Sequence, residues 1–193
     1  MIKNTSYGYG ALAILFHWAM ALLIVGMLAL GLYMSGLPQT DPQTFALFQL
    51  HKSIGFVVLL FAVLRLLWRA VNPSPKLPSH MPVWEKGIAH LGHTGLYAMM
   101  FLLPLSGWLM VSASPWGIPT IVFNLFEMPH LPVPGFLGDK ASAEAILKLV
   151  HEYGAYFLIA LIIGHVAAAM KHHFISRDET LRRMISVRMQ RTD

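Results

Sequence analysis

Two histidines within one long apolar stretch are the residues of this sequence best suited to chemistry. The stretch runs from Ile146 to Met170, and His151 and His165 stand fourteen residues apart in it. In an α-helix this spacing makes almost four whole turns, so both imidazoles would point the same way, roughly 21 Å apart along the axis. Ionisable side chains inside a membrane helix are rare and usually functional. The spacing indicates ligands of two separate centres, and the alternative is two histidines that hydrogen-bond to carbonyls of neighbouring helices.

Composition predicts the setting in which these histidines work. Of the 193 residues, 56% are hydrophobic and 12% are charged, against roughly 25% charged in an ordinary soluble domain. We therefore expect an integral membrane protein, and we read the net charge of +5 as membrane topology rather than as a sign of nucleic acid. The chain has no cysteine, which excludes disulfides, iron–sulfur clusters and thiolate zinc sites.

Four apolar stretches predict the elements that position the histidines. We expect an all-α membrane protein, a single domain built as a bundle of four transmembrane helices at about residues 11–33, 43–70, 87–112 and 143–172. Asp41 and Pro42 are typical of a helix N-cap followed by the first helical residue. The proline-rich connection from Ala113 to Ala141 is expected to form an ordered cap, and the basic tail 173–193 to contain a short surface helix on anionic lipid.

Lysine and arginine indicate the orientation of the bundle. They concentrate in the tail and in the connection between the second and third spans, whereas the two other connections carry more acidic residues. By the positive-inside rule, both termini are expected in the cytoplasm.

This orientation gives each histidine a depth. His17 and His165 would each lie roughly 9 Å from the inner surface, and His51 and His151 roughly 9 Å from the outer surface. Ligands of one metal must share a depth, so these are two candidate pairs. His93 is about as deep as His17, and depth alone leaves the choice between them open.

Elimination suggests which metal such pairs could hold. Two histidines without a third protein ligand are too few for a closed zinc site or for a hard octahedral cation. An iron that brings four porphyrin nitrogens needs only an axial pair. Gly55, Gly154 and Gly164 would let a flat macrocycle approach the backbone.

An ordered set of short motifs extends over nearly the whole chain. Its members are His17-Trp18 in the first span, His51 opening the second, the Ala89–His93 sequence AHLGH opening the third, His151, Glu152 and Gly154 followed by His165 in the fourth, and a closing KHHF with RDETLRRM. This set resembles the bacterial cytochrome b561 family, whose members are four-helix electron carriers of the inner membrane.

The resemblance implies cofactors, ligands and partners. It implies two b-type haems (heme B), one held by His17 and His165 and the other by His51 and His151, which would also be the iron ligands. It implies a multi-pass protein of the bacterial inner membrane that carries electrons in a respiratory chain. Its partners would be the lipid bilayer, a quinone such as ubiquinone and an unidentified periplasmic donor, for which superoxide is one candidate. Quinone oxidoreductase activity and a homodimer stay open.

Two other functions are compatible with the same residues. The chain could be a haem-bearing anchor subunit that connects a dehydrogenase or hydrogenase to quinone, or a histidine-lined transporter of metal ions or protons.

Further polar residues gather where the inner surface is expected. They are His90, His93, His172, His173, Arg65 and Arg69. Such a rim could bind haem propionates or a quinone, or it could be a band of interfacial anchors. On the outer side we interpret Lys52, Lys140 and Lys148 as interfacial anchors, although they could attract a small anion.

Overall fold

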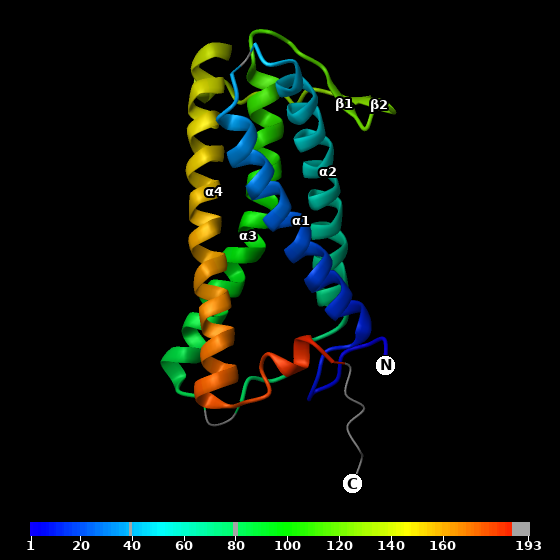
Figure 1. Cartoon of the computed structure of the whole chain (residues 1–193), viewed down its shortest axis with the longest axis vertical. Helices are drawn as coiled ribbons and strands as arrows, with labels where there is room; N and C mark the ends of the chain where they lie inside the picture. Colours follow the sequence, from blue (N-terminus) through cyan, green and yellow to red (C-terminus); the bar gives the residue numbers. More distant parts are fainter. Residues whose placement is uncertain (39, 79–80, 187–193) are drawn as a thin grey trace. The chain divides into compact units, whose positions relative to one another are not determined.

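Four long helices make up most of the computed structural model, which describes residues 1–38, 40–78 and 81–186. They are α1 (Ala11–Ser35), α2 (Pro42–Val71), α3 (Val83–Ala113) and α4 (Lys140–Met170) (Figure 1). The shorter elements are a hairpin of β1 (Thr120–Val122) and β2 (Phe126–Met128), 3₁₀ turns at Gly135–Leu137 and Arg182–Met184, and a π-helical segment at Lys171–Ser176.

All four helices are long and apolar enough to cross a membrane. Most of their large hydrophobic side chains are exposed in the isolated chain, as expected where lipid replaces water as the solvent. The fold is thus all-α and consistent with a four-span membrane bundle.

Local hydrogen bonds explain where the helices begin. The Asp41 carboxylate accepts a hydrogen bond from the Gln43 amide at 2.8 Å, and α2 starts at Pro42, which confirms the predicted cap. In the same way the Asp139 carboxylate accepts a hydrogen bond from the Ser142 amide at 2.8 Å. Hydrogen bonds from the backbone and the side chain of Ser142 lower the pKa of the Asp139 carboxyl. The helix α4 therefore begins a few residues before the expected start at residue 143.

The helix α3 also begins earlier than the hydropathy pattern suggested. It starts at Val83, directly after Pro82, instead of at residue 87. Proline can precede a helix because its missing amide hydrogen costs nothing there. Glu85 consequently lies in the first turn of α3.

The four helices contribute to two compact units. Unit 1 consists of Met1–Ala21, Phe61–Tyr97 and Ala160–Asp193, and unit 2 consists of Leu22–Leu60 and Ala98–Ile159. Each unit contains one of the two predicted histidine pairs, so each pair can be described within its own unit.

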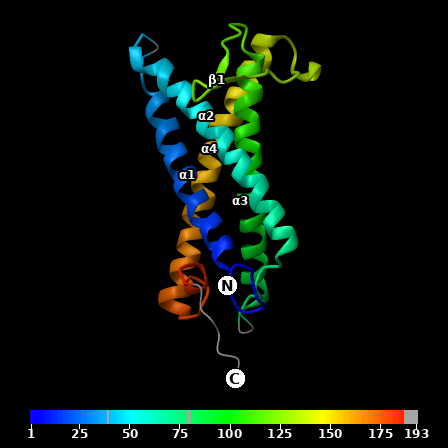
Figure 2. The ribbon, with the colours of Figure 1, turned by 90° about the vertical axis from the view of Figure 1, so that its right-hand side faces the viewer.

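In unit 2 the long connection after α3 is ordered, as predicted. The amide of Phe123 donates to the Ser53 hydroxyl at 3.0 Å, and the Trp108 indole donates to the Pro129 carbonyl at 3.0 Å. The connection also contains the hairpin β1–β2, which was not predicted (both strands are labelled in Figure 1, and β1 in Figure 2). Its turn places Phe123 and Asn124 at positive φ. Such turns usually contain glycine, and the absence of glycine here explains why the sequence did not indicate the hairpin.

In unit 1 the N-terminal residues pack against the chain that follows α2. The Asn4 side chain donates to the carbonyls of Asn72 and Pro73 at 3.2 Å and accepts from the Gly10 amide at 2.9 Å. A Cβ at Gly10 would lie 2.1 Å from the Ile2 carbonyl oxygen. Only glycine fits this close approach.

The segment after α4 differs from the expected surface helix. Arg177 adopts a left-handed conformation with φ of 53°, which ends the helix, and only the 3₁₀ turn Arg182–Met184 follows within the described chain. The segment is held instead by hydrogen bonds that Asp178 and Met184 accept and by one that Arg183 donates. The last part of the predicted tail, with Arg188 and Arg191, lies outside the described residues.

Candidate metal centres

In unit 2, His51 of α2 and His151 of α4 lie side by side. Their ring centroids are 6.3 Å apart and the ring planes are inclined by 80°. With metal–nitrogen bonds of about 2.0 Å, two imidazoles at this separation could hold one metal ion between them. His51 and His151 are therefore candidate ligands of one centre.

The environment of His151 selects one tautomer. Its Nδ1 lies 3.1 Å from the Leu103 carbonyl oxygen and 3.0 Å from the Ser106 hydroxyl oxygen. Because a carbonyl oxygen can only accept, Nδ1 carries the proton and Nε2 keeps a free lone pair. A metal-binding histidine is normally oriented in this way by a hydrogen bond from its other nitrogen.

His51 lacks a comparable partner. Its Nδ1 is buried and accepts or donates no hydrogen bond within the described part of the chain. A buried polar atom without a partner is unusual in a completed structure. The pair His51–His151 thus has the chemistry of a site that binds a further group.

Two glycines make room for these rings. A Cβ at Gly107 of α3 would lie 3.0 Å from the His151 Cε1, and a Cβ at Gly31 of α1 would lie 3.3 Å from the His51 Cε1. Sequence reasoning named Gly55, Gly154 and Gly164 instead, but a Cβ there would meet only methionine or leucine side chains or open space. Gly31 lies twenty positions from His51, so no local pattern points to it.

In unit 1, three histidines meet. The His165 ring of α4 lies 6.1 Å from the His17 ring of α1 and 5.6 Å from the His93 ring of α3, measured between centroids. The structure brings the predicted pair together and keeps His93 beside it as a neighbour. The centroid separation of His17 and His165 is similar to that of His51 and His151.

Arg65 of α2 adds a charge to this cluster. Its Nη2 lies 3.3 Å from the His17 Nδ1, and its Nε donates to the Tyr97 hydroxyl at 3.2 Å. A guanidinium only donates, so His17 here accepts at Nδ1. Coordination through the His17 Nε2 requires the opposite tautomer, and Arg65 would then have to donate to another acceptor.

Beside this cluster lies a cavity of about 210 Å³. Its lining residues are Leu66, Arg69, His90, His93, Thr94 and Tyr97. The guanidinium groups of Arg65 and Arg69 lie 5.3 and 4.9 Å from the Tyr97 ring centroid. Neither arginine pairs with a carboxylate among the described residues.

The structure divides the predicted inner rim. His90 and His93 line the cavity, whereas His172 is hydrogen-bonded to Asp178 and the His173 ring packs on Phe174. These last two histidines do not contribute to the cavity.

The described residues contain no group of three or more histidine, cysteine, aspartate or glutamate side chains placed to hold a metal ion. A closed tetrahedral zinc site needs four such ligands. The two histidine pairs fit a metal that brings most of its own ligands, as the iron of a porphyrin does.

Comparison with known proteins agrees with this chemistry. The family model described as prokaryotic cytochrome b561 matches residues 8–187. Cytochrome b561 homolog 2 of Escherichia coli K12 is 37% identical over 94% of this chain and 93% of its own length. A probable superoxide oxidase CybB of Yersinia pestis is 31% identical over 92% and 95%, and cytochrome b561 homolog 1 of E. coli is 28% identical over 88% and 92%. The chain therefore belongs to the prokaryotic cytochrome b561 family.

Proposed function

We propose that the protein is a transmembrane electron-transfer cytochrome with two bis-histidine haems, which exchanges electrons with the quinone pool. The family implies haem b and di-haem electron transfer. The observation that carries the proposal for this chain is the pairing of histidines within each unit, with ring centroids 6.1 Å apart for His17–His165 and 6.3 Å for His51–His151.

A b-type haem with two axial histidines transfers single electrons and offers no coordination position to a substrate. The protein's part is to hold and orient the imidazoles. The Leu103 carbonyl fixes the His151 ring through Nδ1, and Gly107 and Gly31 allow the rings to lie against the helix backbones. His93 is a neighbour of the inner pair in this proposal and is not a ligand.

The cavity in unit 1 supports a quinone site. A quinone ring presents two carbonyl acceptors, and its reduction consumes protons. Arg69 and Thr94 can donate hydrogen bonds to such carbonyls, and the imidazole of His90 can act as a proton donor. All three line the cavity.

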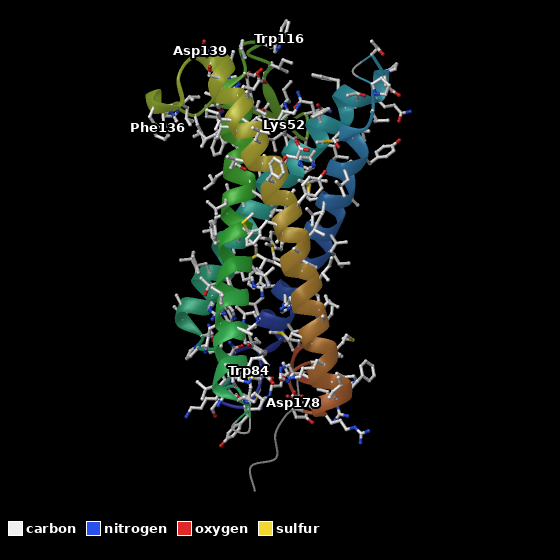
Figure 3. The ribbon with its side chains drawn as sticks, turned by 90° about the vertical axis from the view of Figure 1, so that its left-hand side faces the viewer. Lys52, Trp84, Trp116, Phe136, Asp139 and Asp178 are labelled. Atoms are coloured by element: carbon white, nitrogen blue, oxygen red, sulfur yellow. The ribbon has the colours of Figure 1, made fainter. Side chains whose placement is uncertain are left out.

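The relative from Yersinia pestis suggests an electron donor. It is named a probable superoxide oxidase, and superoxide is therefore our candidate donor for this chain. Lys52 is one of the predicted outer lysines and is labelled in Figure 3. Its Nζ donates a hydrogen bond to the Pro119 carbonyl oxygen at 3.4 Å. This contact supports a structural role for Lys52 rather than a role in attracting the donor.

We further propose a location in the bacterial inner membrane with both termini in the cytoplasm. The concentration of arginine and lysine in the connection after α2 and in the tail supports this orientation. The cavity of unit 1, which is built from the end of α2 and the start of α3, would then lie on the cytoplasmic side.

Pyridine haemochrome analysis of the purified, haem-saturated protein tests the proposal. We expect two haems b per chain, with a low-spin spectrum in the oxidised and the dithionite-reduced protein. One haem per chain would remove the di-haem assignment, and a protein without a Soret band would favour the transporter.

A further inference from the structure

The segment that follows α4 carries a sequence motif, KHHF with RDETLRRM, that the proposed function leaves without a role. After Met170 the helix continues as the π-helical segment Lys171–Ser176 and then reverses at the left-handed Arg177. The Asp178 amide closes the reversal by donating to the His172 carbonyl at 3.1 Å. The chain thus returns toward the helices it has just left.

Asp178 is the buried centre of this return, with only 8% of its surface exposed (labelled in Figure 3). Its carboxylate accepts a hydrogen bond from the His172 Nδ1 at 2.6 Å and another from the Thr180 amide at 2.8 Å. A buried carboxylate is tolerated only when it is paired and hydrogen-bonded. Asp178 therefore needs both partners, His172 and Thr180, to be buried here. A tail exposed to solvent would not need them.

The same network reaches the first turn of α3. The Lys171 Nζ lies 2.6 Å from one oxygen of Glu85, and the His172 Nε2 lies 3.8 Å from the other. The His172 ring therefore lies between two carboxylates, one from α3 and one from the returning segment. Both ends of this contact belong to unit 1.

The far end of the returning segment reaches α1. The Trp18 indole donates to the Met184 carbonyl at 2.7 Å, and the Arg183 guanidinium donates to the Lys76 carbonyl at 2.8 Å. Trp18 follows His17, and the two rings are 5.3 Å apart at an interplanar angle of 89°. The residue next to a predicted axial ligand therefore donates a hydrogen bond to the tail.

We propose that residues 177–184 form a clasp that positions the inner haem ligand. The clasp is fixed at one end by Asp178 and at the other by the hydrogen bond from Trp18 to Met184, and this bond sets the rotation of α1 that aims the His17 ring. The role of His17 rests on the proposed function, whereas the fixing of the tail does not. Trp18 and Asp178 are positioning residues in this account.

Two variants and one matched control test the clasp in the full-length, haem-loaded protein. Trp18→Phe keeps an aromatic ring and removes the donor to Met184, and Asp178→Asn keeps the size and removes the charge. Trp108→Phe is the control, because it removes an equivalent indole-to-carbonyl hydrogen bond, to Pro129 at 3.0 Å, in unit 2.

The first readout needs no haem. Trypsin should cut at the arginines of residues 177–184 about fivefold faster in Trp18→Phe, because one net hydrogen bond that closes the segment is lost. Asp178→Asn should show at least this acceleration. The control Trp108→Phe should be cut there at the wild-type rate.

The second readout separates positioning from simple anchoring. In Trp18→Phe, the midpoint potential and the electron paramagnetic resonance g-values should shift for the haem that His17→Ala removes, and for no other haem. Faster cleavage with unchanged g-values and potentials would show an anchored tail without a positioning role and would overturn the proposal. Unchanged cleavage in both variants would also overturn it. If His17→Ala removes no haem, the proposed function fails while the cleavage result still reports on the clasp.

Discussion

Gly107 offers a sharp steric test of the centre in unit 2. A Cβ at this position would lie 3.0 Å from the His151 Cε1 and 3.3 Å from its Nδ1, whereas carbon atoms pack best at about 3.5–4.0 Å. In Gly107→Ala the ring must therefore move, and moving it weakens the bond between Nδ1 and the Leu103 carbonyl. The free protein can let the ring swing away, so the cost appears when His151 has to return to the position proposed for a haem ligand.

The size of the effect follows from the packing. Overpacking of this kind costs about 1–3 kcal/mol, which corresponds to roughly 5- to 150-fold weaker haem binding. Gly31→Ala should weaken binding less, because its Cβ would lie 3.3 Å from the His51 Cε1. Gly26→Ala is the control, since a Cβ there meets nothing within 4 Å and the gain in helix propensity is the same.

Haem transfer from the loaded protein to an excess of apomyoglobin measures this change. We expect Gly107→Ala to lose one of its two haems faster than the wild type, and this haem should be the one that His151→Ala removes. The reasoning is refuted if Gly107→Ala retains haem like the wild type, or if Gly26→Ala loses haem to the same extent.

Three other expectations follow from the structure. His90→Ala should slow quinone reduction by roughly 10-fold or more while both haems stay bound, as is common when a proton-transfer group is lost. Trp116→Ala should not slow it. The reverse result would move the quinone site to the outer connection. Burial alone would raise the pKa of the Asp178 carboxyl, but hydrogen bonds from Thr180 and His172 outweigh burial and hold this pKa below its usual value. The stability that the carboxylate contributes should therefore be complete above about pH 4 and lost as the pH falls through the lowered pKa. Melting temperatures of the wild type and Asp178→Asn, measured against pH, should therefore converge in acid, and a constant difference would contradict the assignment. A reporter fused near Lys76 should be active only if it requires the cytoplasm, and alkaline phosphatase activity there would reverse the orientation.

Helix existence was largely predictable because it follows from local chemistry. An uncharged stretch such as Ala11–Ser35 has few alternatives to a membrane helix. The cap at Asp41 was predictable because Asp41 and Pro42 are adjacent in the sequence. The early start of α3 escaped prediction because the apolar pattern begins near residue 87, whereas the helix starts directly after Pro82.

The convergence of the histidines was predictable in part. Depth along the helices made His17–His165 and His51–His151 candidate pairs, and the structure brings each of these pairs together. Depth could not exclude His93, and its ring is indeed beside His165. Which group the histidines bind remains a prediction.

The supporting contacts were not predictable from the sequence. Gly107 and Ser106 serve His151 across 44 and 45 positions, counted from the residue numbers. The Trp18–Met184 bond joins residues 166 positions apart. Such contacts depend on helix rotation and on the return of the chain, and neither leaves a local sequence pattern.

Redox titration of single-ligand variants tests the central claim most directly. Each variant replaces one histidine with alanine, and the titration shows which of the two haem potentials disappears. The account predicts that His17→Ala and His165→Ala lose the same potential and that His51→Ala and His151→Ala lose the other, while His93→Ala keeps both. Loss of the inner potential in His93→Ala with its retention in His17→Ala would contradict the pairing.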